Sequence, residues 1–303
     1  MKLSLNPLFR CNFKCDFCYL TWSQLTSKTR LSPERLDSIL QEMPPWEKIE
    51  WVDLYGGEIG LLKPEQFYEY RRVLRQYYKG EINIITNLSM IQPYFFDSDV
   101  YLSVSYDFDA REKHDVVWQN MMQSEVPIAV LILASPKVLE MDVDFMINML
   151  NTCGSVESVE IKPYSDNQAN AHRVRHDEFE EFVIKWLESP IPKNFEFVNE
   201  QRIEDSLSGK YNAFSDDHVY ILPYGELAVL DFDKDDKEYF ERLEGWKEYY
   251  EWTEKEKREL SPICQECEFK GKCLTEHYRK VENLDHSCNG YFNLLNKYKS
   301  NGV

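Results

Sequence analysis

Short apolar runs rich in β-branched residues alternate with longer helical patterns through most of this 303-residue chain. Such alternation predicts repeated βα units around a parallel sheet. Six units precede residue 188, two fewer than a closed eight-unit barrel contains. The sequence therefore predicts an α/β fold, a partial (β/α)6 TIM-like barrel, with its functional residues at the C-terminal ends of the strands. The predicted strands are residues 2–8, 49–55, 81–86, 100–106, 128–133 and 156–162.

Helical patterns follow most of these strands, several with Ser, Asp or Pro at the N-terminal positions that capping favours. The crossover at residues 90–98 has the weakest helical pattern. The predicted helices are residues 33–43, 64–78, 111–122, 142–150 and 177–187.

A C-x3-C-x2-C run, Cys11, Cys15 and Cys18, follows the first predicted strand. Three thiolates hold three irons of a cubane [4Fe-4S] cluster and leave the fourth iron open, whereas a structural cluster normally takes four cysteines. A zinc or redox site is the alternative for the same residues, although zinc sites usually show paired C-x2-C halves. We therefore predict a cluster with one open iron.

Polar residues and glycines gather where later strands end. Glycines let a backbone edge approach a ligand closely. Strand alternation places Ser103 and Ser105 on one face, so at least one of them is expected to point into the barrel. Lys162, Tyr164 and Gln168 follow the sixth strand and are candidates for lining a substrate cavity. The other strand-end residues are Gly56, Gly57 and Glu58 after strand two, Asn87 after strand three and Asp107 after strand four.

The cysteine run, the Gly-Gly-Glu tripeptide and the six-unit barrel resemble the core of the radical S-adenosylmethionine (radical SAM) superfamily over roughly residues 1–187. The resemblance implies that the open iron binds S-adenosylmethionine (AdoMet). It implies reductive cleavage of AdoMet to a 5'-deoxyadenosyl radical, which abstracts a substrate hydrogen, and an external electron donor of the flavodoxin or ferredoxin type. The AdoMet contacts that it implies are Phe17, Gly56, Gly57, Glu58, Asn87, Ser103, Ser105 and Asp107.

The pattern changes at the Ser-Pro-Ile-Pro stretch of residues 189–192, which predicts the end of the barrel domain, residues 1–188. A bridging segment of residues 189–217 and a C-terminal module of residues 218–303 are expected to follow. The module begins with a predicted hairpin at residues 218–230, around a Pro-Tyr-Gly turn, and a charged helical segment at residues 237–260.

A second cysteine group lies in this module, and Cys153 is the one cysteine left over, expected to pack at a helix end. Four cysteines with a C-x2-C half would by themselves favour a structural zinc site. Behind a radical SAM barrel, however, the module resembles the SPASM and twitch extensions, which carry auxiliary [4Fe-4S] clusters. A cysteine pair flanks the hairpin glycine in a full SPASM module, and Gly225 lacks that pair. We therefore predict a small twitch-like α+β module with one auxiliary cluster, held by Cys264, Cys267, Cys273 and Cys288.

The formal net charge is -18, from 35 basic and 53 acidic side chains. Such a field repels polyanions, so nucleic acid is not an expected partner. Neither a signal-peptide apolar region nor a membrane-length apolar window is recognised in the sequence, which predicts a cytoplasmic protein without a membrane partner.

Three functions are compatible with these features. The first, favoured by analogy with related enzymes, is oxidative crosslinking of a ribosomally made peptide. The second is dehydrogenation of a small molecule, such as a sugar or natural product, by a twitch-type enzyme. The third, from another class, is a non-catalytic protein with structural zinc sites.

Overall fold

The computed structural model describes residues 1–164, 174–209, 218–230, 240–258, 265–270, 273 and 291–299. Within them, ten strands form one curved sheet in the order β10-β9-β8-β1-β2-β3-β4-β5-β6-β7. The six central strands are parallel neighbours in chain order, which confirms the predicted βα repeat. These strands are β1 (Lys2–Leu5), β2 (Trp51–Leu54), β3 (Ile82–Thr86), β4 (Val100–Ser105), β5 (Ile128–Leu133) and β6 (Val156–Lys162).

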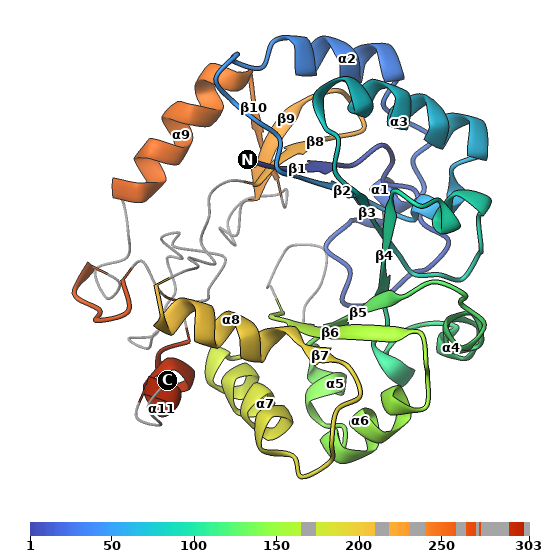
Figure 1. Cartoon of the computed structure of the whole chain (residues 1–303). Coiled ribbons are helices and arrows are strands. Elements are labelled where there is room, and N and C mark those ends of the chain that lie inside the picture. Colours follow the sequence, from blue (N-terminus) through green and yellow to red (C-terminus); the bar gives the residue numbers. More distant parts are fainter. Residues whose placement is uncertain are drawn as a thin grey trace.

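Helices cover the outer face of this sheet, so the strands form the inner wall of an open barrel (Figure 1). The five predicted helices are present, with ends that differ from the prediction by up to three residues. They are α2 (Pro33–Gln41), α3 (Pro64–Tyr77), α4 (His114–Met122), α6 (Val143–Asn151) and α7 (His176–Glu188).

Local capping explains where two of these helices begin. The Ser32 hydroxyl accepts the N–H of Arg35 at 3.1 Å, and Pro33 takes the first helical position of α2. The Asp142 carboxylate accepts the N–H of Phe145 at 3.0 Å at the start of α6. Both side chains satisfy backbone donors that have no partner inside the helix.

Two crossovers contain 3-10 turns, and the first of them shortens a predicted helix. Helix α4 begins at His114, because η3 (Phe108–Ala110) is a 3-10 turn and Lys113 has a left-handed φ of 53° that interrupts helical backbone. The crossover at residues 90–98 contains only the 3-10 turn η2 (Pro93–Phe96). The remaining short helical elements are α1 (Trp22–Leu25), η1 (Ile59–Leu61) and α5 (Pro136–Leu139).

The predicted hairpin forms and extends the barrel sheet. Strand β8 (His218–Ile221) pairs in parallel with β1, and β9 (Leu227–Leu230) returns antiparallel to β8. The third strand, β10 (Phe240–Leu243), corrects the prediction of a helix from residue 237, since its backbone pairs with β9. The helix, α9 (Trp246–Arg258), starts only after it.

The segment at residues 189–217 also contributes to the barrel. Strand β7 (Glu196–Phe197) pairs with the outer edge of β6, and α8 (Val198–Leu207) follows it directly. The Asn199 side chain donates to the carbonyl of Ile161 and accepts its N–H, at 2.9 and 2.8 Å, which fixes α8 to β6. Both of the proposed outer segments thus contain strands of the barrel sheet, and the domain boundaries at residues 188 and 217 stay a prediction.

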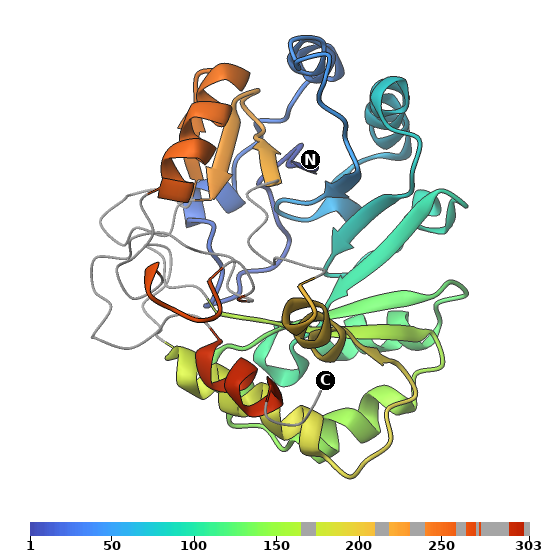
Figure 2. The ribbon, with the colours of Figure 1, turned by 60° about the vertical axis from the view of Figure 1, so that its left-hand side comes forward.

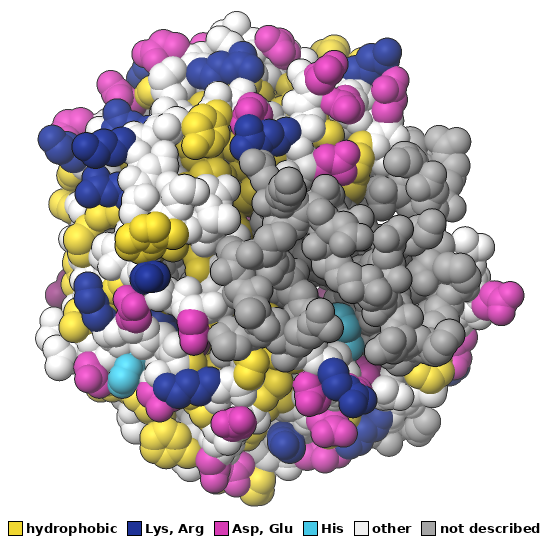
Figure 3. Space-filling view, turned by 180° about the vertical axis from the view of Figure 1, so that it is seen from behind, with side chains coloured by type: hydrophobic (Ala, Val, Ile, Leu, Met, Phe, Trp, Pro, Cys, Tyr) yellow, Lys and Arg dark blue, Asp and Glu magenta, His cyan; other side chains and the backbone are white. Residues whose placement is uncertain are grey.

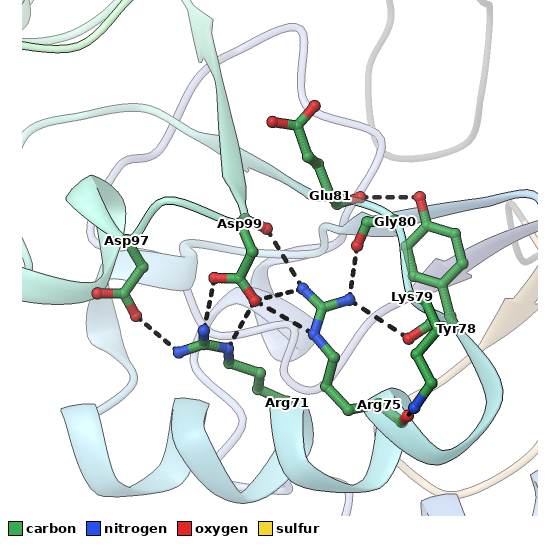
Figure 4. A network of polar contacts seen from close by, with 8 residues as sticks. All are labelled: Arg71, Arg75, Tyr78, Lys79, Gly80, Glu81, Asp97 and Asp99. Carbon is green, nitrogen blue, oxygen red and sulfur yellow. Dashed lines mark hydrogen bonds and ion pairs between the residues drawn. The ribbon is translucent and has the colours of Figure 1, made fainter.

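A charged network fixes α3 against the strands β3 and β4 (Figure 4). Asp99 accepts hydrogen bonds from Arg71 Nε at 2.9 Å and from Arg75 Nε at 3.2 Å. Arg71 also reaches Asp97 at 2.9 Å, and Arg75 donates to the carbonyl of Gly80 at 2.5 Å. Two successive turns of one helix therefore hold the loop that leads into each strand.

The C-terminal helix α11 (Phe292–Lys299) lies beside α7 (Figures 1 and 2). The carboxylate of Glu180, on α7, is only 3% exposed and accepts the N–H of Leu294 at 2.9 Å and the side-chain N–H of Asn293 at 2.8 Å. This contact attaches the end of the described chain to the barrel. None of the helices within the described ranges is long and apolar enough to cross a membrane.

Candidate functional site

A cavity of about 400 Å³ lies inside the curved sheet. Cys11, Cys15 and Cys18 all line it, together with Phe17 from the same loop. The structure thus brings the predicted cluster ligands together directly after β1. The other predicted site residues on its wall are Gly56, Gly57, Asn87 and Ser105.

Backbone N–H groups point at two of the three sulfur atoms. The N–H of Phe13 donates to Cys11 Sγ at 3.4 Å, and the N–H of Leu20 donates to Cys18 Sγ at 3.4 Å. In each case the donor follows the cysteine by two residues. Hydrogen bonds of this kind stabilise the thiolate form and tune iron–sulfur clusters.

The three thiols lie in a buried environment. Burial raises the pKa of each thiol, Cys11, Cys15 and Cys18, to about 11. Any metal or cluster bound by all three thiolates would therefore displace three protons. In the part of the chain that the structure describes, no three Cys, His, Asp or Glu side chains surround one point where a metal ion would sit. A cubane places no such demand, because each thiolate binds a different iron.

The backbone of Gly56 and Gly57 lies against the start of the cysteine loop. Gly57 N–H donates to the carbonyl of Leu8 at 3.0 Å, and Glu58 N–H donates to the carbonyl of Arg10 at 2.9 Å. A Cβ on Gly57 would lie 2.1 Å from the Arg10 carbonyl oxygen, and Gly56 has a φ of +145°. Only glycines allow this close approach, so the pair brings a bare backbone edge to the cavity.

The Glu58 side chain turns away from the cavity. It is fully buried, and its carboxylate accepts Gly60 N–H and the Thr86 hydroxyl at 2.6 Å each and Asn87 N–H at 2.8 Å. Burial raises the pKa of this carboxyl, and the three hydrogen bonds oppose that rise. Glu58 thus joins the end of β2 to the end of β3, and its predicted contact with AdoMet stays a prediction.

Asn87 connects the end of β3 to the cysteine loop. Its side-chain N–H groups donate to Asn12 Oδ1 at 3.0 Å and to Cys11 Sγ at 3.8 Å. Its carbonyl oxygen accepts the N–H of Ser89 at 2.9 Å. A side chain with all of its groups engaged in this way holds Cys11 in a fixed orientation.

The three predicted residues of β4 and its end lie at different depths. Ser105 lines the cavity. The Ser103 hydroxyl donates instead to Asn83 Oδ1 at 2.8 Å, inside the barrel. Asp107 is fully buried and accepts the N–H of Leu133 at 2.6 Å. Strand alternation therefore placed both serines on the inner face, but only Ser105 reaches the cavity.

No protein-family model matches the sequence, and no curated protein matches it. Solved structures do match. Native anSMEcpe with bound AdoMet aligns with a TM-score of 0.70 and 15% identity over 99% of this chain and 96% of that one. The chain has the radical SAM fold. Native anSMEcpe with bound AdoMet and Cp18Cys peptide gives 0.68 and 14% over 99% and 95%. Streptococcus suis SuiB bound to precursor peptide SuiA gives 0.59 and 13% over 96% and 74%.

On this radical SAM fold, the structure adds a cation that the sequence analysis missed. Arg111 lines the cavity, and its guanidinium donates to Cys15 Sγ at 3.8 Å and to Asp107 Oδ2 at 2.7 Å. It also lies over the ring of Phe17, 5.3 Å from the centroid. The i,i+4 spacing of Asp107 and Arg111 is a usable signal, but such spacing is typical of an ion pair on a helix surface and does not indicate a group that faces the cysteine loop.

An aromatic wall was missed as well. Tyr19, Tyr55 and Tyr220 line the cavity beside the glycine edge. The Tyr19 hydroxyl donates to the carbonyl of Gly56 at 3.3 Å, and its ring stacks on Tyr55 at 5.8 Å. Tyr220 comes from β8, so the hairpin that follows the central barrel supplies part of the site. No sequence spacing connects these rings, because they meet only across the folded sheet.

The part of the cavity wall formed by β1, β6, α8 and β8 is rich in basic groups. Lys162 and Tyr164, both predicted to line a substrate cavity, do line it, whereas Gln168 lies outside the described residues. Glu160 pairs with Lys162 at 2.9 Å and with Arg202 at 2.8 Å. These cations contrast with the acidic chain as a whole, and on the face in Figure 3 basic and acidic side chains are interspersed. The Lys and Arg residues on this part of the wall are Lys2 on β1, Lys162 on β6 and Arg202 on α8.

Two members of the second cysteine group, Cys267 and Cys273, lie within the described residues, and both are partly buried against the main core. Phe269 N–H donates to Cys267 Sγ at 3.4 Å, which repeats the two-residue spacing seen at Cys11 and Cys18. Tyr291 N–H donates to Cys273 Sγ at 3.5 Å. The other two predicted ligands, Cys264 and Cys288, lie outside the described residues.

Proposed function

We propose that this chain is a radical SAM enzyme that oxidatively modifies a ribosomally made peptide by forming a crosslink at a substrate carbon. One observation supports the chemistry above all: Cys11, Cys15 and Cys18 share a cavity with the glycine edge of Gly56 and Gly57. An iron–sulfur cluster with AdoMet would supply a carbon-centred radical there.

The chain's own residues provide the conditions for that chemistry. The three thiolates would hold the cluster, and Gly56 and Gly57 line the same cavity without side chains, so a ligand's polar end could meet backbone groups there. The rings of Phe17, Tyr19 and Tyr55 line the same space. Such walls exclude water from a reactive intermediate, which limits side reactions.

A peptide substrate is supported by the structures that share the fold. Two of them contain a bound peptide, Cp18Cys in anSMEcpe and the precursor peptide SuiA in SuiB. The repeated N–H···S geometry at Cys267 supports an auxiliary [4Fe-4S] cluster completed by Cys264, Cys273 and Cys288. Such a cluster would supply an acceptor for the electron released when the substrate radical is oxidised, and a cytoplasmic donor of the flavodoxin or ferredoxin type would supply the electron for the first cluster.

The cavity volume favours a second candidate, a small-molecule dehydrogenase. About 400 Å³ is within the range of pockets that enclose a small ligand. A peptide would instead insert one segment and leave the rest outside.

Iron analysis tests the shared chemistry first. Anaerobically reconstituted wild-type protein is expected to contain about eight irons if it holds two cubanes, to absorb broadly in the visible range, and to form 5'-deoxyadenosine from AdoMet and dithionite. Joint replacement of Cys11, Cys15 and Cys18 by Ala should abolish 5'-deoxyadenosine. Cys153→Ala is the matched control, because Cys153 is a buried thiol outside the cavity. A colourless protein that contains only zinc would contradict the proposal.

Mass spectrometry then separates the two substrates. Short peptides encoded beside this gene, incubated with the holoenzyme, AdoMet and reductant, should lose two hydrogen atoms per crosslink. Fragmentation should show a bond between residues that resists proteolysis. If the holoenzyme oxidises only sugars or other small metabolites made by the products of neighbouring genes, the small-molecule dehydrogenase replaces the peptide-modifying enzyme as the proposed function.

A further inference from the structure

We propose that Arg111 is a positioning residue that raises the reduction potential of the cluster bound by Cys11, Cys15 and Cys18; this proposal rests on the proposed function. Arg111 lies beside one ligand sulfur and has the charge that favours a reduced cluster.

The guanidinium of Arg111 makes three contacts at once. Nη1 donates to Cys15 Sγ at 3.8 Å, Nε and Nη2 reach Asp107 Oδ2 at 2.7 and 2.5 Å, and the plane lies over the Phe17 ring at 5.3 Å. The side chain is 13% exposed, so water screens its charge weakly. The planar guanidinium can make both hydrogen bonds, because it donates in two directions from one rigid group.

Asp107 holds that guanidinium in place. Its side chain is fully buried, and its second oxygen accepts the N–H of Leu133 at 2.6 Å at the end of β5. The backbone contributes as well, because η3 ends at Ala110 and the left-handed Lys113 delays α4 until His114. Arg111 therefore sits in a short connection at the end of β4 instead of on a solvent-facing helix turn.

The direction of the effect follows from charge. Reduction adds an electron to the cluster, so a nearby cation and an N–H···S hydrogen bond stabilise the reduced form more than the oxidised form. Asp107 opposes this effect, but the guanidinium separates it from Cys15 and presents the positive end of the pair to the sulfur. The net expectation is a higher potential and easier electron entry before AdoMet cleavage.

Potentiometric titration monitored by electron paramagnetic resonance measures this directly. The signal to follow is the one that AdoMet perturbs, which distinguishes the first cluster from an auxiliary one. Arg111→Met removes both charge and donor and should shift the potential to more negative values while iron content stays near wild type. Arg111→Lys keeps the charge and should shift it less. Arg10→Gln is the matched control, since Arg10 adjoins Cys11 in sequence but its side chain is exposed and lies outside the cavity; it should leave the potential unchanged.

Each other outcome decides against the proposal. An unchanged or more positive potential in an iron-replete Arg111→Met variant would overturn it. Loss of iron from both Arg111→Met and Arg111→Lys, with iron retained in Arg10→Gln, would show that Arg111 holds the loop rather than setting the potential. If wild-type protein itself shows no cluster signal that AdoMet perturbs, the proposed function fails instead.

Discussion

The carboxylate of Glu58 accepts the backbone N–H of Asn87 at 2.8 Å, and this single contact joins the glycine edge after β2 to the residue that orients Cys11. Glu58→Gln places an amide N–H against one of the surrounding donors. We expect the free energy of unfolding to fall by about 1–3 kcal/mol, the cost of leaving a buried polar group unpaired. AdoMet affinity, measured by equilibrium dialysis of the holoprotein, should fall with it. Glu65→Gln, on the exposed first turn of α3, should change neither value.

The Gly57 position tolerates no side chain. In Gly57→Ala, the new Cβ would meet the backbone carbonyl oxygens of Arg10 and Phe9 at 2.1 and 2.3 Å. Backbone atoms yield less readily than flexible side chains, so the cysteine loop must shift. We expect a lower iron content after reconstitution and loss of 5'-deoxyadenosine formation. Gly154→Ala, whose Cβ would meet nothing within 4 Å, is the control. Normal iron content in Gly57→Ala would refute the close-approach argument.

The Asp99 network predicts a specific pH dependence. Burial alone would raise the pKa of Asp99, but hydrogen bonds from Arg75 and Arg71 outweigh it and lower the pKa below its ordinary value. A carboxyl whose folded pKa is depressed stabilises the protein at neutral pH, and that contribution is lost as pH falls through the folded pKa. Asp99→Asn should cost about 1 kcal/mol at pH 7, allowing for solvent screening of this partly exposed group. In urea titrations the difference from wild type should shrink as the pH is lowered. Asp97→Asn, which removes a single contact to Arg71, should cost less.

Glu180 predicts a dependence of folding stability on pH that is opposite in sign to that of Asp99. Burial raises the pKa of this carboxyl, and the hydrogen bonds from Leu294 and Asn293 oppose that rise. A raised folded pKa means that the folded state binds the proton more tightly, so its stability falls as pH rises from the ordinary glutamate pKa through the folded one. Glu180→Gln should remove this slope.

The same variant tests how α11 is attached. Gln offers one acceptor in place of two and turns an N–H toward a donor, which costs about 1–3 kcal/mol. Amide hydrogen exchange at Leu294 and its α11 neighbours should accelerate at least several-fold, while exchange in β3 and β4 stays unchanged. Glu181→Gln, on the exposed face of α7, serves as control. Equal exchange rates in α11 of Glu180→Gln and wild type would show that packing alone holds this helix.

The six central strands could be predicted because each is a short run buried on both faces, and such runs have a plain sequence signature. The helix caps at Ser32 and Asp142 could be predicted as well, because each side chain bonds a backbone N–H only three residues further along the chain. The start of α4 could not be predicted, because the left-handed Lys113 breaks a segment whose composition suits a helix. Strand β10 was missed because residues 231–239 separate it in sequence from its partner β9, and because its charged residues favoured a helix.

The sequence by itself determined the βα repeat, the cysteine loop after β1 and the positions of Gly56, Gly57 and Asn87 at neighbouring strand ends. These features are local, and parallel strands in sequence order bring their ends to one edge. Only the tertiary structure decided that Glu58 and Asp107 turn into the protein, that Arg111 faces Cys15 and that Tyr220 completes the cavity wall. The physical reason is that the orientation of a buried polar side chain depends on which donors and acceptors surround it, and those partners come from other strands.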